Sequence, residues 1–545
     1  MTAGDKFIVV ALVALMAVVS VGAVFLDQAE RTGIVPAEGG AYIEGVVGSP
    51  QYLEPILAAT DIDDDVVRLA FAGLSQLDRD GTVIPDLATF TTSADGKVWT
   101  FTIRDDAKWH DGLPVTAADV VYTVTLVQDK AYVGPYSDAF RGVLVEALGD
   151  RVVRFTLPDA FGAFAANTTL PLLPAHALIG VGYNDLPRSA FNRRPIGAGP
   201  FRVVEADSRQ VTLARNDDYY KVRPDRQRPW LDKIVLRSYP SASDALTALS
   251  RGEIDGVGGL STADAERART FKNVNLYSFP TSDYNALFLN VRPEKTTFRD
   301  RVVRQAIAAA IDKGRVLDVA VDGRGRVADE LVPPTSWAYV KDVKRYERNL
   351  DDIRKSLDAA DWKDHDNDGI RDKDGVKLQF SISTSNEPSR IASAAQIVDD
   401  LRQVGIAAQP KPVAFGELLG KVVPERTYDA LLLGITGSGD PDPYPLFHSS
   451  EIADPGHNFS GYFTLPLDRA LENSRRTSDL AKRLELLVPV FQTVAVEVPV
   501  IFLYFSDYLY AQSKQVQGLR IMPITSPADR LWNSYDWYVK TAIRR

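Results

Sequence analysis

The stretch VWTFTIRDDAKWHDGLPVTAADVVYTV, residues 98–124, contains the signals of a strand, a turn and a helix in close succession. Apolar and polar side chains alternate over residues 98–104, which is typical of a strand with one buried face. Asp111 and Gly112 then favour a turn. Thr116 can cap a helix with apolar residues at helical spacing, Ala117, Val120, Val121 and Val124. Strand and helix signals alternate along the rest of the chain without a fixed repeat, which predicts a mixed α/β (α+β) fold.

The beginning of the chain reads as an export segment. Residues 7–26 are an uncharged run of about the length that crosses a bilayer core. We interpret residues 1–31 as a signal anchor, which is one N-terminal transmembrane helix, or as a signal peptide cleaved near residue 24. Residues 32–40, which include two adjacent glycines, are expected to form a flexible stalk. The rest of the protein is then anchored outside the cell membrane, or secreted if the segment is cleaved.

Composition and motifs exclude several classes of function. A net charge of −10 without long single-sign blocks argues against a nucleic-acid surface. The absence of cysteine excludes disulfides, thiolate metal sites and a lipidated cysteine as the tether. The sequence contains no nucleophile elbow, phosphate-binding loop or zinc helix, and its five histidines do not pair at metal-binding spacing. These patterns do not indicate an enzyme.

Four carboxylates surround a glycine turn, and they could hold a metal ion: Asp364, Asp366, Asp368 and Asp372. Alternating oxygen ligands followed by Gly369 resemble the opening of a calcium loop. Position twelve of such a loop is Gly375 instead of a glutamate, so the match is incomplete. The alternatives are a structural calcium site and a solvated acidic turn, and no other cofactor is predicted. A melting curve that a chelator leaves unchanged would exclude a stabilising ion.

The stretch at 98–124 closely resembles the signature of the peptide/nickel/oligopeptide solute-binding proteins of ABC importers, which form extracellular solute-binding protein family 5. Other segments resemble further landmarks of that family and follow in the same order. They are FAGLSQLDRDG (71–81), PIGAGPFRV (195–203), ALSRGEIDG (248–256), FLNVRPEKTTFRDRVVRQAIAAAIDK (288–313), GSGDPDPYPLFHS (437–449) and NFSGY (458–462).

The resemblance implies a two-lobed fold like that of the periplasmic binding proteins, of type II with an extra accessory domain and a ligand cleft between the lobes. Mapping the landmarks assigns residues 41–75, 197–286 and 520–545 to lobe I. Residues 76–196 would form the accessory domain and residues 287–519 lobe II. The chain is expected to cross between the lobes near residues 286 and 519.

The resemblance also suggests where a ligand is bound. It places Tyr136 as an aromatic wall of the cleft and residues 434–440 along the bound ligand. Similar peptide receptors pair the ligand's α-ammonium group with an aspartate, but the matching position here is Ser438, and Asp440 could substitute or could only form a turn. Lobe geometry adds two further residues. The candidate ligand-binding set is Tyr52, Tyr136, Asn285, Gly434, Thr436, Ser438 and Asp440.

The resemblance predicts the substrate-binding component of an ABC importer, a non-enzyme that captures oligopeptides or similar small organic solutes by lobe closure. Its partners would be the permease and ATPase subunits in the membrane, and the receptor is expected to be a monomer that binds no nucleic acid. The alternatives are a nickel-chelate or oligosaccharide receptor of the same fold, a membrane-anchored sensory binding protein, and an exported hydrolase, which the missing nucleophile disfavours.

Overall fold

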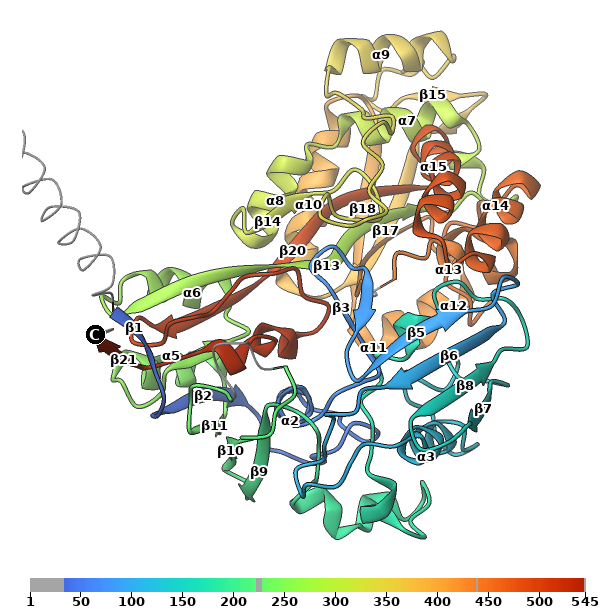
Figure 1. Cartoon of the computed structure of the whole chain (residues 1–545). Coiled ribbons are helices and arrows are strands. Elements are labelled where there is room, and N and C mark those ends of the chain that lie inside the picture. The colour runs from blue at the N-terminus through green and yellow to red at the C-terminus, as the bar shows by residue number, and fades with distance from the viewer. Residues whose placement is uncertain (1–33, 222–227, 438–439, 544–545) are drawn as a thin grey trace, which may run out of the picture.

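The computed structural model describes residues 34–221, 228–437 and 440–543 (Figure 1). The predicted export segment at residues 1–31, with its apolar run at 7–26, and the candidate ligand residue Ser438 lie outside the described residues. Within the described ranges, none of the helices combines the length and apolar character needed to cross a membrane.

A long mixed sheet connects the upper and lower parts of the molecule in Figure 1. Its two longest strands, β13 (Val274–Leu289) and β20 (Val500–Ser513), are rich in aromatic and β-branched residues and pair antiparallel over most of their length. The register of this pair shifts between Pro280 and Tyr284, so the ladder is irregular near its middle. The two strands therefore run continuously from one half of the molecule into the other.

We call the half of the molecule that contains the sheet from β12 to β9 lobe I. Its strands follow β20 in the order β12 (Gly256–Gly258), β2 (Ala41–Val47), β11 (Lys233–Tyr239), β10 (Gln210–Arg215) and β9 (Phe201–Ala206). The helices of this lobe are α2 (Asp61–Ala70), α5 (Ala242–Ser250) and α6 (Thr262–Arg269). The apolar sides of α5 and α6 share one buried cluster, which includes Leu246, Leu249, Val257 and Ala265.

We call the other half lobe II. Its strands follow β13 in the order β19 (Ala430–Ile435), β17 (Gln379–Ser385) and β18 (Ala407–Val413), while β14 (Gly325–Val327) pairs with β20. Its longer helices are α7 (Arg301–Ala310), α8 (Lys313–Val321), α9 (Leu350–Ala359), α10 (Pro388–Arg402), α14 (Leu465–Arg476) and α15 (Leu480–Glu497). Two large apolar clusters form the core of this lobe.

The accessory region, by which we mean residues 76–196, contains a separate sheet in the order β5 (Ala88–Thr92), β6 (Val98–Ile103), β8 (Val152–Thr156) and β7 (Leu144–Ala147). Helix α3 (Ala117–Val127) begins after Thr116 with a capping box. The strand and helix predicted from residues 98–124 are thus confirmed. The core of this region merges with that of lobe I, and the exact boundaries of the three predicted domains remain predictions.

Part of the predicted stalk is ordered. Strand β1 (Ile34–Ala37) lies antiparallel to β21 (Lys540–Ile543), so residues from near the two ends of the chain run side by side (Figure 1). The expectation of a flexible stalk is therefore wrong for residues 34–37. The error arose because the backbone of these residues is paired with a segment about 500 positions away, and no local pattern reports such a partner.

Candidate ligand-binding cavity

A cavity of about 560 Å³ lies where lobe I, the accessory region and lobe II meet. Lobe I contributes residues of α2 and of the short helix η7 (Pro527–Leu531). The accessory region contributes Tyr136 and the turn between β3 (Ser75–Leu77) and β4 (Val83–Pro85). Lobe II contributes the loop at 331–336 and the end of β19. The volume is that of a site for a small organic molecule.

Helix α2 carries charged side chains to the cavity wall because its start is fixed. The Thr60 hydroxyl accepts the N–H of Asp63 (3.3 Å), and the Asp63 carboxylate accepts the N–H of Thr60 (3.2 Å). This capping box satisfies backbone donors of the first turn. Asp64 and Arg68, one turn apart, line the cavity. The opposite face of the helix is buried in the core of lobe I through Ile62, Val66 and Leu69.

Arg530 holds the lobe I side of the cavity together. Its guanidinium makes paired hydrogen bonds to Glu44 of β2 (2.9 and 2.7 Å) and to Asp65 of α2 (2.7 and 2.6 Å). The three side chains are 3%, 0% and 1% exposed. The hydroxyl of Tyr510 donates to Glu44 (2.9 Å), and Tyr42 bonds the same carboxylate. This buried network ties β2, α2 and η7 to one another.

Three of the acidic side chains on the cavity wall have a cation beside them. Asp86 pairs with Lys221 at 2.8 Å, and burial lowers the pKa of that lysine while Asp86 opposes the shift. Asp442 pairs with Arg475 at 2.6 Å. Asp529 lies 3.5 Å from Arg68. Ligand contacts with these three carboxylates would compete with existing ion pairs.

The structure separates the candidate ligand residues into two groups. Tyr136 and Thr436 line the cavity, whereas Tyr52, Asn285, Gly434 and Asp440 are not among the residues of its wall. The Asp440 carboxylate makes a two-pronged ion pair with Arg483 (2.8 and 2.9 Å), whose guanidinium lies 5.1 Å from the centre of the Trp337 ring. Asp440 is thus held by a protein cation. The ligand roles of the whole set remain predictions.

Asn285 and Gly434 lie opposite each other on β13 and β19, where they meet Arg390 of α10. Asn285 accepts a hydrogen bond from the Arg390 guanidinium and donates one to the Ser506 hydroxyl (3.2 Å). A Cβ atom at position 434 would lie 1.9 Å from the same guanidinium. A glycine is needed at this position so that Arg390 can reach Asn285.

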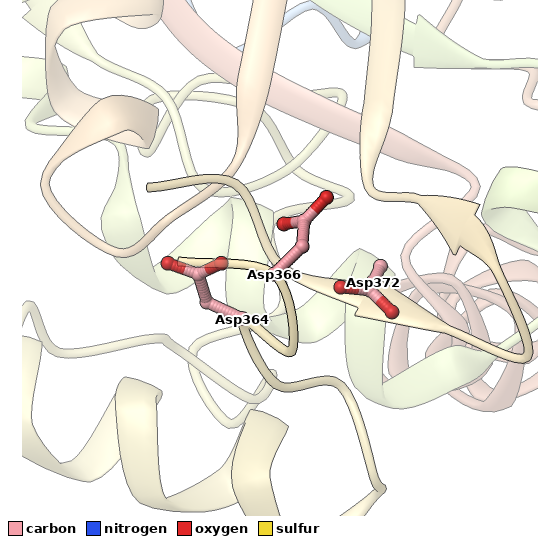
Figure 2. A group of neighbouring side chains, drawn as sticks. All are labelled: Asp364, Asp366 and Asp372. Carbon is pink, nitrogen blue, oxygen red and sulfur yellow. The ribbon is translucent and has the colours of Figure 1, made fainter. Parts of the chain in front are cut away.

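The acidic turn lies in lobe II, and its residues do not line the cavity. Asp364, Asp366 and Asp372 bring carboxylate oxygens within 4.8 Å of one another (Figure 2), whereas Asp368 is not part of that group. The ammonium group of Lys377 lies 2.6 Å from Asp366 and also contacts Asp368. A calcium ion would compete with this lysine. Calcium binding stays a prediction.

A family model described as bacterial extracellular solute-binding proteins, family 5 Middle, matches residues 82–454. The chain belongs to this family. The resemblance inferred from the sequence is confirmed. Among curated relatives of this family-5 solute-binding protein, the oligopeptide-binding protein AppA of Bacillus subtilis is 29% identical over 94% of both chains. The dipeptide-binding protein of Escherichia coli is 26% identical over 88% of this chain and 92% of that protein.

Solved structures share the fold of this family-5 solute-binding protein. The structure of AppA from Bacillus subtilis in complex with a nonapeptide has a TM-score of 0.68 at 29% identity, and the match covers 93% of this chain and 100% of that one. The structure of NikZ from Campylobacter jejuni in complex with Ni(L-His) has a TM-score of 0.70 at 26% identity, covering 91% and 99%. The protein thus has the predicted mixed α/β periplasmic-binding-protein-like fold.

The sequence-based candidate set of this family-5 solute-binding protein did not include the charged residues that α2 and η7 contribute to the cavity wall, which are Asp64, Arg68 and Asp529. The capping pattern from Thr60 to Asp63 could have predicted the start of α2 and hence which residues share a face. It could not show that this face meets η7, because the two segments are more than 450 positions apart in the sequence.

Proposed function

We propose that this family-5 solute-binding protein captures oligopeptides or similar small organic solutes and delivers them to the permease and ATPase subunits of an ABC importer, without catalysing a reaction. The observation that carries the proposal is the cavity, whose walls come from both lobes and the accessory region. The relatives named as oligopeptide-binding and dipeptide-binding proteins support the peptide class. The missing nucleophile and metal motifs support a role in binding alone.

The proposed mechanism is lobe closure. A ligand that contacts α2 of lobe I and the end of β19 in lobe II gains both sets of contacts only when the lobes are together, so binding shifts the population toward the closed form. The irregular register of β13 and β20 near Pro280 and Tyr284 is a place where the two halves can bend relative to each other. The importer would then recognise the closed receptor.

We further propose that the soluble part works as a monomer outside the cytoplasmic membrane, held there by the apolar run at residues 7–26. Because cysteine is absent, the tether would be peptide rather than lipid. Determining the N-terminus of the mature protein tests this proposal. A protein that begins near residue 24 would be secreted instead of anchored.

The peptide proposal predicts thermal stabilisation by ligand. A pool of synthetic tripeptides to pentapeptides is expected to raise the melting temperature of the purified protein by a few degrees. The physical reason is linkage, since a ligand at 100 times its dissociation constant stabilises the folded state by about 2.7 kcal/mol. Differential scanning fluorimetry measures the shift.

Parallel samples with nickel–histidine or an oligosaccharide pool address the two alternative receptors. His457 lies on the cavity wall and is a potential nickel ligand, which is why the nickel sample is included. A shift with either of these probes and none with peptides would replace the peptide proposal by the corresponding alternative.

A further inference from the structure

Three carboxylates on the cavity wall have no ion pair among the described residues: Asp64, Asp78 and Asp80. The carboxylate of Asp78 accepts the N–H of Arg79, and that of Asp80 accepts the N–H and the hydroxyl of Thr82, so only Asp64 lacks a hydrogen bond as well. Among the described residues, none forms an ion pair or a side-chain hydrogen bond with the carboxylate of Asp64. Arg68 lies one turn further along α2 and also lines the cavity. Its guanidinium pairs with the carboxylate of Asp529 at 3.5 Å and not with Asp64. Asp64 therefore differs from Asp86, Asp442 and Asp529, which are paired with protein cations.

An aromatic side chain of the accessory region, Tyr136, lines the same cavity. Burial raises the pKa of Tyr136 to about 12, and the charges of Tyr132, Asp64 and Asp529 add to the shift. Tyr136 and Asp64 both line the cavity. A carboxylate and an aromatic ring on the wall of one cavity are suited to an organic ammonium group, through a charge-assisted hydrogen bond and the ring's negative face.

Lobe closure makes binding at Asp64 depend on the charge of the ligand group. When a ligand fills the cavity and displaces water, an ionised Asp64 loses its hydration. Without a cation on the ligand, no ion pair compensates for that cost. A neutral or anionic ligand group at this position would be disfavoured, whereas an ammonium would restore the balance of charge. Ser438, at the position where the family resemblance implies an acidic partner, carries no charge.

We propose that Asp64 is the specificity-determining anchor for a primary ammonium group of the ligand, with Tyr136 as an aromatic wall of the same cavity. The inference rests on the proposed function, because it assigns the ligand class of the same cavity. It predicts that the protein prefers peptides with a free amine over the same peptides with that amine acetylated.

The anchor is expected to respond to pH. Burial, and then the charges of Asp61, Asp63 and Asp529, raise the pKa of Asp64 to about 6. The facing groups are thus Asp61, Asp63 and Arg68 on α2, Asp529 on η7 and Tyr136 of the accessory region. A carboxyl loses its charge as the pH falls through its pKa, so the preference for an amine is expected to decline as the pH falls from about 8 to about 5.

The test compares three tripeptide pools on the purified full-length protein. The first pool has free amino termini and no lysine, arginine or histidine. The second is the same pool acetylated at the amino terminus, and the third is acetylated but carries one lysine in each peptide. We expect the wild type to bind the first pool about tenfold more tightly than the second, as a charge-assisted hydrogen bond implies. Tight binding of the third pool would place a side-chain ammonium at Asp64 instead of the α-ammonium.

Asp64→Asn is expected to reduce the preference for the free amine to about twofold or less and to remove its dependence on pH between 8 and 5. The matched control is Asp61→Asn, which changes another exposed acid of the same helical turn outside the cavity wall and is expected to keep the preference. The inference is wrong if the wild type binds the first two pools equally, or if Asp64→Asn keeps the preference. If no pool binds at all, the proposed function itself fails.

Discussion

Replacing Arg530 with methionine is expected to lower the free energy of unfolding by about 3–5 kcal/mol. The substitution removes the guanidinium that neutralises Glu44 and Asp65 and leaves two carboxylates almost fully excluded from solvent. Tyr42 and Tyr510 still contact Glu44, but neither hydroxyl carries a positive charge. Urea unfolding followed by tryptophan fluorescence measures the loss.

The dependence on pH identifies the cause of this loss. Burial already raises the pKa of Asp65 to about 6 while Arg530 opposes the rise, so removing Arg530 must raise that pKa further. A carboxyl with a raised folded-state pKa stabilises the protein below its unfolded pKa, and that contribution is lost as the pH rises. The variant should therefore be closer to wild type at pH 5 than at pH 8.

Two further variants serve as controls for Arg530→Met. Adding Glu44→Gln and Asp65→Asn should recover part of the lost stability, because the stranded charges disappear. Arg141→Met removes an arginine whose side chain is 77% exposed and should change stability by less than about 0.5 kcal/mol. A loss below about 1 kcal/mol for Arg530→Met would contradict the role assigned to the buried network.

Local sequence signals were sufficient for two elements of the accessory region, β6 and α3. The alternation over 98–104 and the capping residue Thr116 are properties of neighbouring positions, and β6 and α3 form where they indicate. The pairing of β1 with β21 and the contacts of Arg530 depend on segments hundreds of positions apart. The family resemblance supplied the overall fold, but pattern alone could not supply these contacts.

The same distinction applies to the candidate site. The resemblance placed Tyr136 and Thr436, and the structure has both on the cavity wall. It also suggested Asp440 as a substitute anchor, but Arg483, 43 positions later, contacts that carboxylate. Asp64 carried no sequence signal for ligand binding because its distinguishing property is the lack of a partner in three dimensions. Which carboxylates lack a cation partner can be determined only from the positions of the side chains around the cavity.

Gly162→Ala is expected to weaken ligand binding about tenfold while leaving each lobe folded. Gly162 belongs to the accessory region and donates its N–H to the carbonyl of Arg475 (2.6 Å), near the end of α14 in lobe II. A Cβ atom at position 162 would lie 1.7 Å from the carbonyl oxygen of Thr477, a backbone atom that a rotamer change cannot move away. The accessory region and lobe II would have to separate locally.

The contact matters for binding because it joins the accessory region to lobe II, and both parts contribute residues to the cavity wall. Asp80 of the accessory region also accepts the N–H of Trp337 in lobe II (3.0 Å), so the two parts meet at more than one place around the site. Overpacking a tight contact costs about 1–3 kcal/mol, and a cost that falls only on the closed arrangement lowers the closed population. The apparent affinity falls by the same factor as the fraction of binding-competent protein, and each 1.4 kcal/mol corresponds to about tenfold.

The measurement is a fluorescence titration with a peptide that stabilises the wild type, combined with melting curves of the free and bound protein. Gly182→Ala is the matched control, since a Cβ atom there would have no neighbour within 4 Å, and its affinity should equal that of the wild type. For Gly162→Ala, the melting temperature of the free protein should change less than the ligand-induced shift. If the free protein loses as much stability as the bound form, the contact supports the fold in both states and does not govern closure.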